Sequence, residues 1–397
     1  MSAISKEFSQ IDPSSQLLLL LSRLELTIEQ EKAVLALCSR IDDWAKLTDQ
    51  ARQRFVLPLV YRHLWQLAPE NISPNEFEDM KYQCLTVAQH YLLVASTQRK
   101  LVKELTEPLG ILPIFFKGHS LAARYYDEPA MRFSRDIDVL VPHERMVELL
   151  EAALKKGYIP CDPKQLETDR TSLEFLARVQ GVITLMTPQG VVVEFHQRID
   201  YTGTVYKTEE LLSTAEFIVF EDIEIPVMPT AELFVYICLH HTKHHWSHLH
   251  WLVDLDAVKR HPSFDLNDVY ACAEKRNLTE TVKASLELYE ALASPNPGSQ
   301  PMSAQGRQLL EACLTALQGD YAVEQALSRS RATPDFSFAW QANRWHWLRW
   351  KFFGWVRIFR PSYTDYRNWP LPNRWQWVYR PVRPFREAIR RLGLSKA

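Results

Sequence analysis

The chain has 397 residues, of which 46% are hydrophobic and 24% are charged, and its net charge is −2. This composition is that of a folded protein of two or three domains, and it excludes a disordered or low-complexity chain. Six scattered cysteines without Cys-x-x-Cys spacing exclude a zinc ribbon or a disulfide framework and favour the cytoplasm. The apolar run 17–21 is too short for a signal peptide, and no stretch is long enough to span a bilayer.

Residues 1–105 are predicted to form an N-terminal helical region. Helix-forming residues with helical apolar spacing occupy 17–26, 28–41 and 88–105. Interruptions are expected at Pro58, Pro69 and Pro74. Nothing here indicates catalysis, so we expect this region to pack on a core or to shape an acceptor site.

A strand, a glycine turn and a helix are predicted next. The apolar residues of 111–116 have the pattern of a buried strand, and 119–126 is compatible with a helix. Gly118 allows a backbone to approach a phosphate closely, and a helix N-terminus with a nearby hydroxyl can hold phosphate oxygens. Gly118 and Ser120 are therefore predicted to bind phosphate, with Lys117 neutralising its charge.

Asp136 and Asp138 lie one residue apart in an apolar run that is predicted to be a strand. On a strand both point to one face, whereas Ile137 points to the other. Neighbouring carboxylates repel each other and are costly to desolvate, and a divalent cation relieves both effects. Oxygen ligands suit Mg²⁺ or Mn²⁺. Asp-x-Asp is also common at solvated strand ends, but the preceding strand, glycine and helix favour a metal–nucleotide site.

The next segments are predicted to be a helix and two hairpins. An amphipathic helix over 143–156 ends at Gly157. The hairpins are expected to pair 181–186 with 190–196, and 217–220 with 223–228.

Glu194 and His196 fall on one face of the predicted strand 190–196, opposite Val193 and Phe195. A glutamate among valines is compatible with an exposed edge position. Beside an Asp-x-Asp strand, Glu194 is predicted to be a third metal ligand or a general base.

Residues 229–335 are predicted to form a helical domain, and Thr230 is the expected N-cap of its first helix. That helix is expected to carry the histidines 240, 241, 244, 245, 248 and 250, with His240, His244 and His248 on one face.

Three interpretations of this histidine face are open. A zinc site would need further ligands, such as Glu232 or Asp254. A nucleotide-facing surface would use His240, Lys243 or His244 for phosphates or the base, with Trp246 or Trp251 stacking. Ordinary hydrogen bonding between helices is the third. Asp254 would orient a histidine or be a surface acid.

The C-terminal segment is basic and aromatic. From Trp340 onward there are 13 Lys/Arg and 2 Asp/Glu, a net charge of +11 that leaves −13 for the rest, and eight of the 12 tryptophans lie here. Trp345, Leu348, Phe352, Trp355 and Phe359 form a helical stripe, expected to pack on the catalytic core. The alternatives are an anionic partner, including nucleic acid, or a membrane surface. Five later prolines predict an irregular, extended end.

This arrangement resembles the nucleotidyltransferase superfamily that includes DNA polymerase β, and within it a bacterial nucleotidyltransferase group of largely unassigned function. The motifs that match in order are Lys117-Gly118, Arg132, Asp136-Ile137-Asp138 and Glu194-Phe195-His196. Further matches are His240, His244, Trp246, Trp251, Asp254, Pro361-Ser362, Asp365 and Tyr379-Arg380-Pro381, so the resemblance covers about 100–390. The chain departs from the family where His119 separates Gly118 from Ser120 and where Glu194 replaces the usual Asp.

The resemblance implies an α+β fold. A small mixed-sheet nucleotidyltransferase core at 106–228 would be flanked by the N-terminal helical region 1–105 and the helical domain 229–335, with the basic segment at 336–397. The implied reaction transfers a nucleoside monophosphate, expected to be AMP from ATP, to an acceptor hydroxyl or phosphate.

The resemblance also implies roles for individual residues. Asp136 and Asp138 would bind the Mg²⁺ or Mn²⁺ that holds the NTP, and together with Glu194 they would share a second metal about 4 Å away. Lys117 and Arg132 would neutralise phosphate charge, although Lys117 is also compatible with a structural lysine under the sheet. Arg135 is expected to be exposed.

The acceptor and three other function classes stay open at this point. A small molecule, a peptide or protein, or RNA is compatible as acceptor. The alternatives are a nucleotidyltransferase-like toxin that modifies RNA or protein, a glycosyltransferase that uses Asp-x-Asp for a metal–sugar nucleotide, and a non-catalytic binding module.

Overall fold

The computed structural model describes residues 11–200, 203, 205–295, 301–317, 336 and 338–391. The chain forms two compact units, each built from three stretches. The first comprises Met1–Leu93, Gly118–Ser134 and Pro229–Arg344, and the second Val94–Lys117, Arg135–Met228 and Trp345–Ala397. A mixed sheet with flanking helical regions confirms the predicted α+β class. The four regions expected along the chain stay a prediction.

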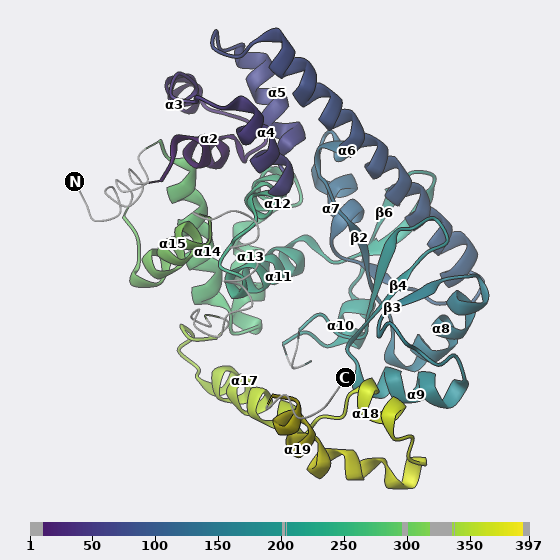
Figure 1. Cartoon of the computed structure of the whole chain (residues 1–397). Coiled ribbons are helices and arrows are strands. Elements are labelled where there is room, and N and C mark those ends of the chain that lie inside the picture. Colours follow the sequence, from purple (N-terminus) through teal and green to yellow (C-terminus); the bar gives the residue numbers. More distant parts are fainter. Residues whose placement is uncertain are drawn as a thin grey trace. The chain divides into compact units, whose positions relative to one another are not determined.

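The second unit contains a seven-stranded sheet with the order β3-β4-β5-β2-β1-β7-β6 (Figure 1). Its strands are β1 (Ile114–Phe115), β2 (Asp136–Leu140), β3 (Ile159–Asp162), β4 (Val182–Met186), β5 (Val192–His196), β6 (Glu216–Phe220) and β7 (Ile223–Val227). β2 runs parallel to β5, and β1 runs parallel to β7, whereas the other neighbours are antiparallel. The sheet is therefore mixed.

Both predicted hairpins are present. β4 pairs with β5 across a turn in which the backbone N–H of Thr187 donates to Val191 and Gly190 has φ +82°. This backbone conformation is one that glycine adopts without strain. β6 pairs with β7 through a turn in which Glu221 takes φ +55°.

The pairing of β2 with β5 positions the acidic residues. In its register Asp138 lies opposite Glu194, and Leu140 lies opposite His196. The alternate side chains of these strands, Ile137, Val139, Val193 and Phe195, are at most 2% exposed. One face of the two strands is therefore apolar and buried, and the other carries the acids.

The helices of the second unit lie beside the sheet (Figure 1). They include α8 (Met146–Lys155), which packs against α9 (Arg170–Val179), and α10 (Thr208–Ser213). A 3-10 turn, η3 (His143–Arg145), precedes α8, and Gly157 follows it with φ +86°. The predicted helix over 143–156 and its glycine end are therefore confirmed.

The first unit is helical. Its helices are α2 (Pro13–Leu21), α3 (Ile28–Cys38), α4 (Trp44–Gln53), α5 (Leu57–Leu67), α7 (Gly118–Tyr125), the short η2 (Pro129–Met131), α11 (Thr230–Lys243), α12 (Leu249–Arg260), α13 (Leu266–Lys275), α14 (Thr279–Ala293) and α15 (Ala304–Leu317). The long α6 (Pro74–Lys100) begins in the first unit, ends in the second and continues as the π-helix η1 (Leu101–Thr106).

Three predicted helix ends are wrong. The first helix stops at Leu21 rather than at residue 26, because Ser22 Oγ and Arg23 Nε donate to carbonyls of its last turn. The last N-terminal helix starts at Pro74 rather than at residue 88. Thr230 is not the N-cap of α11, since Pro229 holds that position and Thr230 Oγ1 lies 2.7 Å from Ser263 Oγ.

The histidine-rich stretch is not one helix. α11 ends at Lys243, and His245 and Trp246 take φ values of +55° and +51° before α12 begins at Leu249. Trp246 is fully buried, and its Nε1 donates to Thr242 Oγ1 at 3.3 Å. Burial of this indole accompanies a turn that a continuous helix would not allow, so the predicted common face of His240, His244 and His248 is wrong.

The C-terminal segment is helical rather than irregular. Its elements are α17 (Trp345–Val356), η5 (Arg357–Phe359), α18 (Tyr363–Asn368), η6 (Asn373–Val378) and α19 (Tyr379–Arg391). Ser362 and Asp365 form a capping box that starts α18, and Tyr366 stacks on Phe175 of α9 with ring centroids 4.5 Å apart. The predicted extended conformation is therefore wrong. Over the described ranges, no helix combines the length and apolarity needed to cross a membrane.

Candidate functional site

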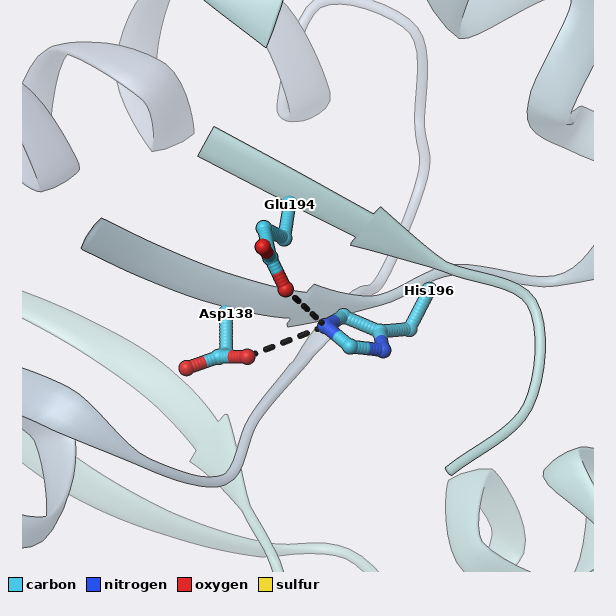
Figure 2. A group of neighbouring side chains, drawn as sticks. All are labelled: Asp138, Glu194 and His196. Carbon is cyan, nitrogen blue, oxygen red and sulfur yellow. Dashed lines mark hydrogen bonds and ion pairs between the residues drawn. The ribbon is translucent and has the colours of Figure 1, made fainter. Parts of the chain in front are cut away.

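Asp138, Glu194 and His196 meet on the polar face of β2 and β5. Nε2 of His196 lies 2.9 Å from Oδ1 of Asp138 and 3.3 Å from Oε2 of Glu194 (Figure 2). Asp138 and His196 are buried, whereas the Glu194 side chain is 33% exposed. Glu194 is therefore the member of the cluster that solvent or a substrate can reach most easily.

Positive groups surround the Asp138 carboxylate. Nζ of Lys117 lies 3.3 Å from its Oδ1. Burial by itself would raise the pKa of Asp138, but Lys117 and His196 hold that pKa below its usual range. Burial would likewise lower the pKa of His196, yet hydrogen bonds with Asp138 and Glu194 raise it overall. A protonated His196 and Lys117 thus balance the acids.

Asp136 experiences the opposite environment. Burial, and then the negative charges of Asp138 and Glu194, raise its pKa to about 6. Lys117 and the exposed Arg135 offset this only in part. The exposure of Arg135 is as predicted. Three carboxylates that repel one another in this way favour the entry of a cation.

The residues present fit a divalent cation. One ligand atom from each of Asp138, Glu194 and His196 can be chosen so that all three lie within 4.8 Å of one another. Two carboxylate oxygens and an imidazole nitrogen suit Mn²⁺ and related metals, and a neutral His196 is required to ligate. Asp136 lies on the same face of β2, two residues before Asp138.

His196 was not among the predicted site residues. The signal was present, because Glu194-x-His196 places both side chains on one face of a strand. The pattern could not show that the imidazole reaches the acid of a different strand.

Gly118, Ser120 and Arg132 belong to the first unit. Gly118 has φ +61° and begins α7, and Ser120 in the first turn is buried. Arg132 makes two hydrogen bonds with Asp254, at 2.7 and 2.8 Å, and the hydroxyl of Tyr126 donates to the same carboxylate at 2.7 Å.

Asp254 is 1% exposed. The interpretation of Asp254 as a surface acid is therefore wrong, and its observed partners are Arg132 and Tyr126. Asp254 therefore balances the charge of the buried Arg132. Orientation of a histidine by Asp254 stays a prediction. A phosphate contact by Arg132 stays a prediction.

The histidine region of the first unit is an aromatic cluster. His241 stacks on Trp251, with ring centroids 4.2 Å apart, and His240 stacks on Tyr236. Lys243 is exposed, whereas the full burial of Trp246 removes it as a platform for a base. Within the described ranges these histidines do not bring three metal ligands together. Nucleotide contacts by His240, Lys243 and His244 stay predictions.

A cavity of about 290 Å³ lies beyond the ends of β2 and β5 in the second unit. Its lining includes His143, Arg178, Arg198 and Lys207, against one acid, Glu209. Gly181 makes room for Arg198, since a side chain at residue 181 would come within 2.9 Å of its Nε. The cavity is therefore basic, and Gln197 in its wall directly follows His196.

The mixed sheet and its acidic cluster define an α+β protein with a candidate metal site. The family model described as an uncharacterised nucleotidyltransferase matches residues 41–294, well over half of the chain. The chain belongs to this nucleotidyltransferase family, as the resemblance implied. The match includes both acidic strands, but not the motifs expected at 361–381. No curated protein matches the chain.

Proposed function

We propose that this chain is a metal-dependent enzyme that transfers a nucleoside monophosphate, AMP in the first instance, from an NTP to an acceptor hydroxyl or phosphate. One observation carries the proposal. The Asp136-x-Asp138 strand lies in parallel register beside the Glu194-x-His196 strand, which gathers three potential ligands within 4.8 Å. The family membership supports the same reaction class.

Asp136, Asp138, Glu194 and a neutral His196 would hold the divalent metal. Mg²⁺ or Mn²⁺, as a pair in the two-metal form of this chemistry, supplies charge neutralisation on the phosphates and a lower pKa for the attacking hydroxyl. Three carboxylates would offset most, though not all, of the charge of two divalent cations, and the raised pKa of Asp136 is consistent with a cation binding beside it.

In the proposed reaction the acceptor oxygen forms a bond to the α-phosphorus, and the bond from that phosphorus to the bridging oxygen breaks. Pyrophosphate leaves, and the hydroxyl proton passes to solvent or, where Glu194 acts as a base instead of a metal ligand, to its carboxylate, the most exposed of the cluster. Lys117 offsets charge on the phosphates. Gly118 and Ser120 at the start of α7, with Arg132, His240, Lys243 and His244, are the further proposed nucleotide contacts.

The acceptor that we propose is anionic. The support is the basic cavity beyond the carboxyl ends of β2 and β5, which offers Arg178, Arg198 and Lys207 to a phosphate or carboxylate. Lys207→Ala should then raise the KM for acceptor by about tenfold and leave the KM for NTP unchanged. Equal KM values for acceptor in the two proteins would contradict this placement.

The experiment incubates purified protein with each α-labelled NTP, Mg²⁺ or Mn²⁺, and an extract of the source cells. Label should enter one fraction of the extract and identify nucleotide and acceptor class together. Asp138→Asn and Glu194→Gln should each lower the rate by about a hundredfold or more.

Glu224→Gln provides the matched control, because Glu224 is an exposed glutamate on another strand of the same sheet. It should leave the rate unchanged. Transfer by Asp138→Asn at the wild-type rate would refute the assignment. Turnover of a UDP-sugar without NTP turnover would favour a glycosyltransferase, and absence of Mg²⁺–NTP binding in calorimetry would favour a binding module.

A further inference from the structure

The apolar stripe of α17 faces outward. Of its five residues, Trp345, Leu348, Phe352 and Trp355 are 52–67% exposed, and Phe359 in η5 is half-buried. Ile358, next to Phe359, is 43% exposed. At 100° per residue the four side chains of α17 share one side of the helix. These four side chains therefore face solvent. The predicted packing of this side of the helix on the catalytic core is wrong.

The opposite side of α17 is the half-buried one. It carries His346, Trp350 and Phe353, and the guanidinium of Arg349 lies 5.5 Å from the Phe353 ring centroid. The helix thus has one half-buried side and presents a second, apolar side to solvent.

α19 also exposes apolar side chains to solvent. Arg383 and Arg386, on one side of the helix, each lie 3.0 Å from a carboxylate oxygen of the buried Asp365. Phe385 and Ile389, one turn apart on the other side, are 71% and 44% exposed. A helix of a globular domain normally buries its apolar side, whereas α19 is held by the buried Tyr379 and by its arginines and exposes Phe385 and Ile389.

The two helices are connected within the second unit. η5 follows α17 directly and packs against α19. α17 and α19 therefore lie close to each other (Figure 1). Between them, Trp369, Trp375 and Trp377 are 48–60% exposed. The C-terminal segment from Trp340 onward carries a net charge of +11 and lies outside residues 41–294, which match the family model.

We propose that α17, η5, η6 and α19 form a docking surface for an anionic phospholipid bilayer. Tryptophan and phenylalanine side chains partition into the interface between headgroups and acyl chains, and nearby arginines and lysines bind anionic headgroups. α17 has 12 residues, too few to span a bilayer, so the helices would lie in the plane of the surface.

The composition of this docking surface favours lipid over single-stranded nucleic acid. Aromatic side chains can stack on bases, but Leu348, Ile358 and Ile389 have no ring to offer. These aliphatic side chains are among the exposed side chains of α17, η5 and α19. Acyl chains accept aliphatic and aromatic groups alike.

The test is sedimentation of the full-length protein with vesicles. Binding should be strong with vesicles of phosphatidylcholine and phosphatidylglycerol, weak with phosphatidylcholine alone, and weaker at high ionic strength. Phe352→Ser with Trp355→Ser should lower the partition coefficient by about tenfold or more, since two large apolar groups leave the interface.

The matched control is Phe217→Ser with Trp65→Ser. It removes one phenylalanine and one tryptophan of similar exposure, 55% and 59%, from other parts of the chain. This variant should bind vesicles like the wild type. Circular dichroism should show that both variants keep wild-type helicity.

Three outcomes would overturn the proposal. The first is that the protein binds charged and neutral vesicles equally, or binds neither. The second is that vesicle binding falls equally in the test variant and in the control variant. The third is binding of a fluorescent single-stranded oligonucleotide, lost with Phe352→Ser and Trp355→Ser, by a protein that ignores vesicles.

Discussion

Nε2 of His196 lies 2.9 Å from Oδ1 of Asp138, across the parallel pair of strands β5 and β2. Hydrogen bonds with Asp138 and Glu194 raise the pKa of His196 above its ordinary 6.5 despite burial, so the imidazole keeps its proton to higher pH. A metal ligand must give that proton up. We therefore expect the affinity for Mn²⁺ to rise with pH from about 6 to about 8, with release of a proton.

Calorimetry in two buffers of different ionisation enthalpy measures this release directly. His196→Gln cannot titrate, so it should show a flatter pH dependence and less proton release. Identical proton release from the two proteins would contradict the assignment of His196.

Asp136→Asn should stabilise the metal-free protein at neutral pH. The pKa of Asp136 is raised from 3.8 to about 6, first by burial and then by Asp138 and Glu194. The folded state therefore holds this proton more tightly than the unfolded state, and the contribution of Asp136 to stability falls as pH rises from about 4 to about 6. Removing the charge should return on the order of 1–3 kcal/mol at pH above about 7.

Urea unfolding with a chelator measures the gain for Asp136→Asn, and the same experiment at a pH of about 4 is its control, where the two proteins should converge. Saturating Mn²⁺ should reduce or reverse the gain, because the variant has lost a proposed ligand. A less stable variant in chelator would mean that the Asp136 carboxylate is well satisfied.

Asp254→Asn should destabilise the protein by about 3–5 kcal/mol, because it leaves the buried Arg132 without its counter-charge. The Arg132 and Asp254 side chains are 7% and 2% exposed. The control is Glu290→Gln, which breaks the more exposed ion pair between Glu290 and Lys259. Lys259 lies on α12, as Asp254 does, and this change should cost less than about 1 kcal/mol. Similar midpoints of urea unfolding for both variants would show that the Arg132 pair is dispensable.

His63 should contribute a loss of stability as pH falls from about 6.5 to about 4, which is opposite in sign to the contribution of Asp136. Burial lowers the pKa of His63 from 6.5 to about 4, and its Nε2 lies 2.7 Å from the carbonyl oxygen of Arg23. The unfolded state takes up a proton in this range and the folded state does not, which costs up to about 3 kcal/mol. His63→Gln should show a flatter dependence of unfolding free energy on pH, and parallel curves would exclude His63 as a source.

Local features of the site were predictable from sequence. The common face of Asp136 and Asp138 and that of Glu194 and His196 follow from the period of a strand. The hairpin of β4 and β5 follows from two apolar runs separated by a glycine-containing turn. Each of these predictions depends on residues that are close in the sequence.

The remaining features depend on contacts between distant segments. The pairing of Asp138 with Glu194 joins residues from different parts of the sequence, and no local pattern specifies it. The break after Lys243 accompanies burial of Trp246, which tertiary packing determines. The stripe of α17 was recognised, but periodicity identifies an apolar side without showing whether it faces the protein or solvent.

The alignment of Asp138 with Glu194 and of Leu140 with His196 has a practical consequence. A slip of β5 by one residue would turn Glu194 and His196 to the apolar face and leave Asp138 opposite a valine or phenylalanine. A molecule with this misaligned strand would then lack the metal site, so it would neither bind Mn²⁺ there nor catalyse transfer. Stoichiometric titration with Mn²⁺ would therefore count the correctly assembled molecules in a preparation, without knowledge of the acceptor.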